Sequence, residues 1–172
     1  IIGVDPAEGN PNSDSSVAIV VNRNTLEQCA VVAGIIEPDI LTSYVIGLCR
    51  WYNSAQIMVE RNNHGHVVLQ ILNDTMAVRG NVMKGVDGRA GWMSSSRGKA
   101  IMYDSLVEEV RAGTVVIHDE ETKTQLSLIE GSSLRAPEGK HDDHAVAMAL
   151  AVTGAVMKPV ENFMFSYLKQ EA

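Results

Sequence analysis

The chain opens with Ile1-Ile2-Gly3-Val4-Asp5-Pro6, and this stretch decides the fold. Its first four residues are typical of a buried strand, and they lead directly into an aspartate before Pro6 stops the hydrogen-bond ladder. Asp5 therefore marks the carboxyl end of a strand. In open α/β sheets ligands bind just beyond those ends, so a carboxylate at this position either forms a turn or takes part in chemistry.

The rest of the chain predicts a mixed sheet flanked by helices. Apolar runs at residues 17–21 and 28–36, joined by a polar turn, predict an antiparallel meander with the first strand, and further strands are expected at 56–60 and 115–117. Apolar periodicity and terminal signals predict helices at residues 40–52, 67–76, 98–111, 120–129 and 145–156. This order lacks the strand–helix alternation of a Rossmann fold. It predicts an α/β fold with a five-stranded sheet of antiparallel and parallel strands.

Two further acidic positions share the setting of Asp5. Glu60 ends the apolar run at 56–60, and Asp142 and Asp143 precede the helix at 145–156, which is apolar nearly all round and is therefore expected to be buried. If the strand of Glu60 lies parallel to the first strand, Asp5 and Glu60 end side by side. The buried helix then directs its N-terminal acids at the same point.

A cluster of carboxylates favours bound cations. Carboxylates that meet repel one another and raise one another's pKa, so the cluster persists at neutral pH only with cations or protons among them. Oxygen ligands without cysteine and with few histidines favour Mg²⁺ or Mn²⁺. Two such ions about 4 Å apart can activate a water molecule and stabilise the leaving oxygen of a phosphodiester. We therefore predict a nuclease.

Each acidic residue also has a structural explanation. Asp5 before a proline could end a strand through an Asx turn, and Asp142 or Asp143 could cap the helix, because carboxylates accept amide hydrogen bonds and oppose the positive end of the helix dipole. Neighbouring helix residues point about 100° apart, so one can cap while the other binds metal. Asp14 is interpreted as a turn residue, with an outer ligand of a second ion as the alternative.

The basic residues are few and scattered. The net charge of −7 argues against a general nucleic-acid coat, but it is compatible with an enzyme that contacts nucleic acid briefly. Arg97 and Lys99 are the favoured phosphate contacts, because they follow three serines at a helix start, where hydroxyls, amides and cations all suit a phosphate. The other candidates lie in loops around the acidic points: Arg61, Lys84, Arg89, Arg135 and Lys140.

The remaining features carry no chemistry. Cys29 and Cys49 lie in apolar surroundings without CxxC spacing and are predicted to be reduced core residues. The glycine-rich segment 80–92 is interpreted as a mobile ribbon. No apolar run reaches the ~18 residues of a membrane span, and no signal segment is recognisable, so we expect a soluble, intracellular protein without a membrane partner.

Four segments resemble the C-terminal nuclease domain of the large terminase subunit of tailed bacteriophages, which belongs to the RNase H-like (retroviral integrase) superfamily. They are GVDPAEGNPNSD at the start, VERNNHGH around Glu60, GWMSSSRGKAIMYDSLVEEVRAG in the middle and APEGKHDDHAVAMALA near the end. Together they cover most of the chain in the family's order, and the combination is specific.

The resemblance implies one RNase H-like nuclease domain over residues 1–172, preceded in the full polypeptide by an ATPase motor domain. It implies a metal-dependent endonuclease that cuts concatemeric viral double-stranded DNA during genome packaging in the host cytoplasm, with portal and small terminase proteins as partners. Its catalytic carboxylates fall on Asp5, Glu60 and the Asp142–Asp143 pair, and it favours Asp143 as the direct ligand. Many relatives carry a further aspartate where this chain has Val146, a role that Asp142 or Asp14 would have to fill.

Other functions remain open at this point. The same superfamily contains Holliday-junction resolvases, which are nucleases of a different substrate geometry. An RNase H-like fold also occurs in sugar kinases and actin-like ATPases. Those proteins need further glycine-rich phosphate-binding loops and the second half of their fold, which this chain of 172 residues lacks. No GxxxxGK[ST] loop occurs here either. The third alternative is a non-catalytic DNA clamp in a larger assembly.

Overall fold

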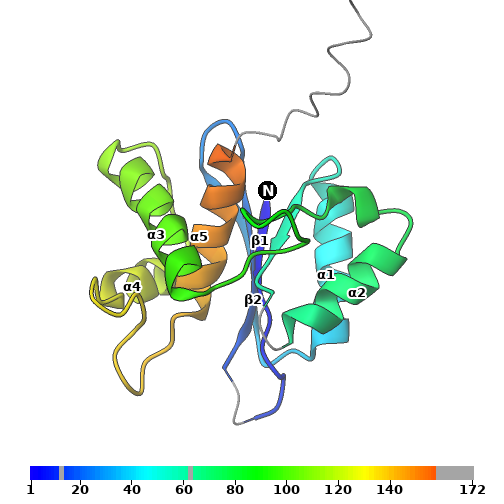
Figure 1. The fold of residues 1–172 in the computed structure, drawn as a ribbon, viewed down its shortest axis with the longest axis horizontal. Coiled ribbons are helices and arrows are strands. Elements are labelled where there is room, and N and C mark those ends of the chain that lie inside the picture. Colours follow the sequence, from blue (N-terminus) through cyan, green and yellow to red (C-terminus); the bar gives the residue numbers. More distant parts are fainter. Residues whose placement is uncertain (12–13, 62–63, 158–172) are drawn as a thin grey trace, which may run out of the picture.

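A computed structural model of the chain describes residues 1–11, 14–61 and 64–157 (Figure 1). The strands are β1 (Ile2–Asp5), β2 (Ser16–Val21), β3 (Gln28–Gly34) and β4 (Ile57–Val59). The helices are α1 (Pro38–Trp51), α2 (Gly65–Asp74), the short 3₁₀ helix η1 (Arg79–Asn81), α3 (Ser96–Arg111), α4 (Glu120–Leu128) and α5 (Asp143–Val156). The structure thus contains every helix that the sequence predicts.

The sheet is mixed, as predicted, but it has four strands in the order β3-β2-β1-β4. Strand β1 pairs antiparallel with β2 and parallel with β4, and β2 pairs antiparallel with β3. The predicted fifth strand at 115–117 is wrong, because this segment makes only one bridge, from Val116 to Glu27. The side-chain carbonyl of Gln28 then accepts the amides of His118 and Asp119, at 2.9 and 2.8 Å, and these bonds lead the chain into α4.

Local signals set the helix starts. Pro38 is at the first turn of α1, where its missing amide costs no hydrogen bond. The Ser95 hydroxyl accepts the Gly98 amide at the start of α3, and the Asp119 carboxylate accepts the Thr122 amide at the start of α4. Asp119 is therefore the capping residue of α4.

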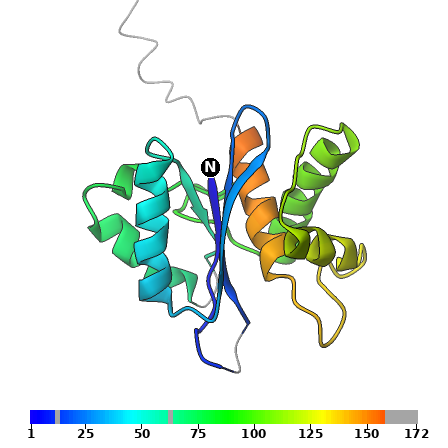
Figure 2. The same cartoon turned by 180° about the vertical axis from the view of Figure 1, so that it is seen from behind.

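Helices cover both faces of the sheet. Figures 1 and 2 show α1 and α2 on one side of the sheet and α5 against the other face, with α3 and α4 packed beside α5. Because side chains alternate along a strand, Ile2 and Val4 of β1 pack into the core with α1 and α2, while Gly3 faces α5. The same alternation directs Asp5 toward the α5 face.

Gly3 allows β1 and α5 to lie in backbone contact. A Cβ atom on Gly3 would lie 2.0 Å from the carbonyl oxygen of Ala147 and 2.6 Å from the amide nitrogen of Ala151. Residues spaced by four lie on one face of a helix, so Asp143, Ala147 and Ala151 form a line along β1. Asp143 therefore lies at the end of this line, at the level of Asp5.

Two smaller predictions concern the cysteines and the glycine-rich segment 80–92. Cys49 is buried as predicted, but Cys29 is exposed, because it lies on the edge strand β3, where no further strand covers it. The segment 80–92 is anchored at its end, where Trp92 is 1% exposed and bridges Glu60. Among the residues that the structure describes, no helix is long and apolar enough to cross a membrane.

Candidate metal centre

Asp5 and Glu60 lie side by side at the ends of adjacent parallel strands. The register pairs Val4 with Val59, and the amide of Glu60 donates to the carbonyl oxygen of Val4 at 2.8 Å. Glu60 shares the orientation of Met58, which packs into the core under α5. The carboxyl groups of Asp5 and Glu60 are hydrogen-bond partners on this face of the sheet. The parallel arrangement that the sequence predicts is therefore present.

The first turn of α5 contributes the next two acids. Asp143 is 6% exposed, and its Oδ2 accepts the amide of Ser15 at 3.2 Å. Asp142 is the N-cap residue by position, but its side chain makes no capping bond, and its Oδ2 instead accepts the amide of Ala136 at 3.4 Å. Capping by the Asp142 side chain, one of the roles considered from the sequence, is therefore absent.

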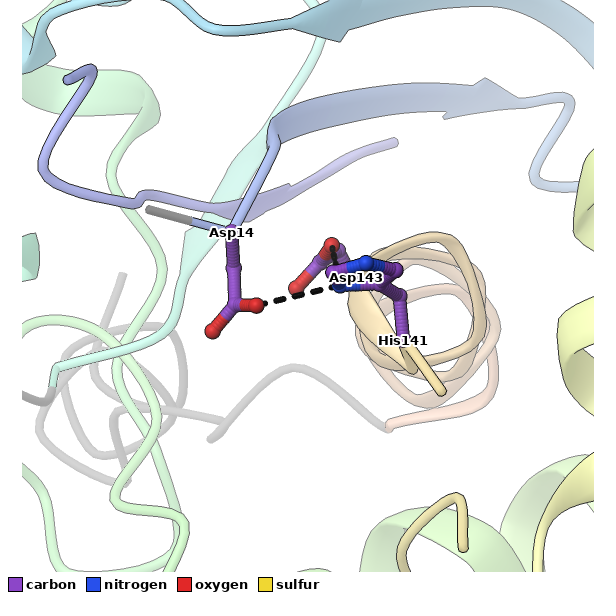
Figure 3. A group of neighbouring side chains, drawn as sticks. All are labelled: Asp14, His141 and Asp143. Atoms are coloured by element: carbon purple, nitrogen blue, oxygen red, sulfur yellow. Dashed lines mark hydrogen bonds and ion pairs between the residues drawn. The ribbon is translucent and has the colours of Figure 1, made fainter. Parts of the chain in front are cut away.

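Asp14 extends the cluster through a histidine. Figure 3 shows the side chains of Asp14, His141 and Asp143 directed toward one another. His141 Nδ1 lies 3.0 Å from Oδ1 of Asp14 and 3.9 Å from Oδ2 of Asp143. One ligand atom from each of the three residues lies within 4.8 Å of the others, a spacing that could hold a metal ion. Asp14 thus belongs to the acidic cluster as well as to the loop before β2.

All five predicted acidic ligands line one hollow of about 370 Å³. Glu8 and His64 also line the hollow and could bind a metal, although the sequence did not single them out as ligands. Val146 forms an apolar part of the wall. Because Val146 offers no oxygen, any additional carboxylate at this site would come from Asp142, Asp14 or Glu8. The complete lining is Asp5, Pro6, Ala7, Glu8, Asp14, Glu60, His64, Lys99, Asp142, Asp143 and Val146.

The electrostatics of the hollow oppose ionisation of its acids. Burial raises the pKa of Asp5 well above its usual value, and the charge of Glu60, its hydrogen bond and the charges of Asp143 and Asp142 act in the same direction. Burial, with the charge of Asp14, raises the pKa of Asp143 to about 6, although the Ser15 amide and His141 act against this shift. The hollow is therefore a place where protons or cations are held strongly.

The donor set fits hard divalent cations. The site offers carboxylate oxygens, of which those of Asp5 and Asp143 are buried, and no thiolate, which is the ligand chemistry of Mg²⁺ and Mn²⁺. A cation between Asp5, Glu60 and Asp143 would offset the repulsion between their negative charges. The arrangement could therefore bind a divalent ion and present it to a ligand in the hollow.

The predicted basic residues fall into two groups. Lys99 lines the hollow, whereas Lys84, Arg89, Arg97, Arg135 and Lys140 are exposed outside it. Arg61 is buried and pairs with Asp87. A phosphate contact by Arg61, one of the roles considered from the sequence, is therefore unfavourable, because it would require breaking this ion pair.

Sequence reasoning missed His141, Glu8 and His64. Neither His141 nor His64 has the spacing of a metal-binding motif, and Glu8 lies in a loop rich in turn residues. Only the return of the chain from β1 through the loop to β2 brings Glu8 and Asp14 beside α5. No signal in the sequence alone could have assigned Glu8, His64 or His141 to the site.

We expect the metal-free protein to be less stable at about pH 8 than at about pH 5. A carboxyl group with a raised folded-state pKa holds its proton more tightly when folded, so the free energy of unfolding falls as pH rises from about 3.9 toward the folded value. For Asp143 that value is about 6. Asp5 acts in the same direction, because burial raises its pKa well above the usual value. The loss should be on the order of 1–3 kcal/mol, or several degrees in thermal midpoint.

Thermal midpoints in a chelating buffer at the two pH values test this expectation. Addition of Mg²⁺ at the higher pH should restore the lost stability, because the ion replaces the protons. A midpoint that is higher at pH 8 without metal would contradict the electrostatics described above.

Comparison with known proteins gives structural matches only. No protein-family model and no curated protein matches the chain. The magnesium-bound crystal structure of the large terminase nuclease from thermophilic phage G20c superposes with a TM-score of 0.67 at 20% identity, over 89% of this chain and 80% of that chain. The cobalt-bound form of that nuclease gives 0.69 at 18% identity, over 88% and 79% of the two chains, respectively. The zinc-bound form gives 0.66 at 19% identity, over 87% and 77%.

These matches show the fold. The chain has the α/β architecture of a large terminase nuclease, so the resemblance found in the sequence is confirmed at the level of the fold.

Proposed function

We propose that this chain is a metal-dependent DNA endonuclease of the terminase type, which cleaves concatemeric viral DNA during genome packaging. The observation that carries the proposal is the meeting of Asp5, Glu60 and Asp143, from β1, the end of β4 and α5, in one hollow. The fold is that of a nuclease whose crystal structures contain magnesium, zinc or cobalt. A hollow of acids on such a fold supports a metal-dependent nuclease.

The acidic residues would hold one or two Mg²⁺ or Mn²⁺ ions. Asp5, Glu60 and Asp143 are the proposed catalytic ligands, and Asp142 and Asp14 are the proposed additional ligands. When bound, a pair of ions supplies an activated water molecule and stabilises the leaving oxygen of a phosphodiester. The chain contributes the fixed placement of the carboxylates, through strand pairing for Asp5 and Glu60 and through helix packing for Asp143.

DNA is the proposed substrate, and Lys99 is a basic residue placed beside the proposed chemistry. Its side chain lines the hollow, where a cation can bind the phosphate next to the one being cut. Arg97, Lys84, Arg89 and Lys140 are exposed and can bind the backbone further away. With a net charge of −7, this domain alone should bind duplex DNA weakly. Tight placement would then come from an ATPase motor domain in the same polypeptide and from portal and small terminase proteins in the host cytoplasm.

A nicking assay on supercoiled plasmid tests the activity. We expect nicking with Mn²⁺ and with Mg²⁺, and no turnover with Ca²⁺, because the larger ion binds but relaxes the octahedral geometry that in-line attack needs. Chelation should abolish the reaction. A parallel assay on a four-way DNA junction distinguishes a terminase-type nuclease from a Holliday-junction resolvase, since cleavage of the junction alone would favour the resolvase. If neither DNA is cut with any of these ions, the chain is not a nuclease by itself.

A further inference from the structure

The first turn of α5 is capped from outside the helix. The first amides of a helix have no partner within it, and an acidic N-cap side chain normally accepts the second or third of them. Here the amide of His144 donates to Oε1 of Gln125 on α4, at 2.8 Å. Asp142, the N-cap residue, makes no such bond with its side chain. A neutral amide from another helix thus replaces the carboxylate that the sequence offers.

Gln125 is held firmly in this position. It is 5% exposed, and its Nε2 donates to Oε1 of Glu121 at 2.9 Å, which fixes the orientation of the amide group. A second link joins the same two helices, because His144 Nδ1 lies 3.2 Å from Oδ2 of Asp119 and 3.3 Å from Oγ1 of Thr122. Both links act on His144, the residue that directly follows Asp143.

We propose that Gln125 is a positioning residue for the metal centre, and this inference rests on the proposed function. Gln125 occupies the His144 amide, so the Asp142 carboxylate is not drawn into capping the helix and remains on the wall of the hollow. Without this acceptor the amide would be buried and unpaired, which is unfavourable. The Asp142 side chain is the acceptor that helix geometry places within reach, and its rotation would remove an oxygen from the hollow and tilt the turn that carries Asp143.

The test compares Mn²⁺ binding by the parent with that of two variants at one position. Gln125→Met keeps the length and shape of the side chain but has no acceptor for the amide. Gln125→Glu keeps the acceptor and tests whether the hydrogen bond, rather than the amide group itself, is needed. Binding is measured by the paramagnetic resonance of free Mn²⁺ in a titration, without DNA, and thermal midpoints are recorded in parallel.

We expect Gln125→Met to weaken Mn²⁺ binding by about tenfold, as for other residues that orient metal ligands. Gln125→Glu should stay within about threefold of the parent, because its carboxylate still accepts the His144 amide. Leu126→Ala is the matched control, since it removes apolar packing at the next position of the same helix. It should lower the thermal midpoint without changing the Mn²⁺ affinity.

Each outcome decides the proposal. Equal Mn²⁺ affinity in the parent and in Gln125→Met would overturn it and leave the proposed nuclease function intact. An equal loss in Leu126→Ala would show that general destabilisation, not capping, sets the affinity, and would also overturn it. If the parent itself binds no Mn²⁺, both the proposed function and this inference fail. Should Gln125→Met not fold, Gln125→Asn, which is one methylene too short to reach the amide, replaces it with the same expected loss.

Discussion

Replacing Asp5 by asparagine is expected to lower metal-dependent DNA cleavage by about 10³-fold or more, which corresponds to about 4 kcal/mol in the activation barrier. Asp5 is central to the hollow, because it is hydrogen-bonded to Glu60 and interacts with the charges of Asp143 and Asp142. Asparagine keeps the shape of the side chain and can still donate to Glu60. The loss would therefore come from the missing negative charge toward the cations.

The same substitution should stabilise the metal-free protein. The carboxyl group of Asp5 is buried among other acids, and its ionisation is opposed by its surroundings. A neutral amide removes this repulsion, so the thermal midpoint in chelating buffer at neutral pH should rise by about 2–4 °C. Loss of activity together with higher stability is the signature of a residue retained for chemistry.

Asp104→Asn on the exposed side of α3 is the matched control, because it makes the same chemical change outside the hollow. Nicking rates and thermal midpoints are measured for both variants in parallel. A variant with asparagine at position 5 that still cleaves plasmid at the parental rate would remove Asp5 from the proposed site.

Gly3→Ala is expected to have the largest effect on folding. Its Cβ would lie 2.0 Å from the carbonyl oxygen of Ala147 and 2.6 Å from the amide nitrogen of Ala151, and both are backbone atoms of a buried helix. Backbone cannot move aside as a side chain can, so α5 would have to lift from β1. Overpacking of this kind should cost about 3 kcal/mol or more, which lowers the thermal midpoint by roughly 6–12 °C.

Gly154→Ala, a change within α5 itself, provides the comparison. Its Cβ would contact Cγ2 of Ile1 at 3.0 Å and Sδ of Met83 at 3.1 Å, both in side chains that can adjust. The gain in helix propensity offsets the crowding, so we expect a change within about 1 kcal/mol. Thermal or urea unfolding of the two variants measures the difference. Equal stabilities would show that β1 and α5 are not in the close contact described here.

The fold could be predicted from the sequence where a hydrophobic pattern is compatible with only one kind of element and one degree of burial. The apolar run before Asp5 and the similar run before Glu60 predicted two strands ending in carboxylates, and a helix apolar on every side could only be buried against them. Together they were sufficient to predict the sheet class and the meeting point of the acids. The strand count failed because residues 115–117 have the composition of a strand, whereas the Gln28 side chain diverts the chain after one bridge.

The rest of the site depends on tertiary contacts that leave no mark in the local sequence. His141 approaches Asp14 only because the loop after β1 turns back toward α5. Asp142 and Asp143, at the start of α5, look like helix caps in the sequence, and the residue that caps the second amide of the helix, Gln125, lies on a different helix. An acceptor from a distant segment cannot be recognised from spacing, since no period connects the two positions.

The contact of β1 with α5 has a consequence for protein synthesis. Asp5 and Glu60 precede Asp143 along the chain, so both are translated before the helix α5 that carries Asp143. On the ribosome, a growing chain therefore has two of its three central carboxylates and lacks the helix that covers them. The complete set of proposed ligands first exists after α5 has emerged and docked onto Gly3. If the chain is the nuclease proposed above, an incomplete chain released before that point should not cut DNA, because it lacks Asp143 for holding the ions.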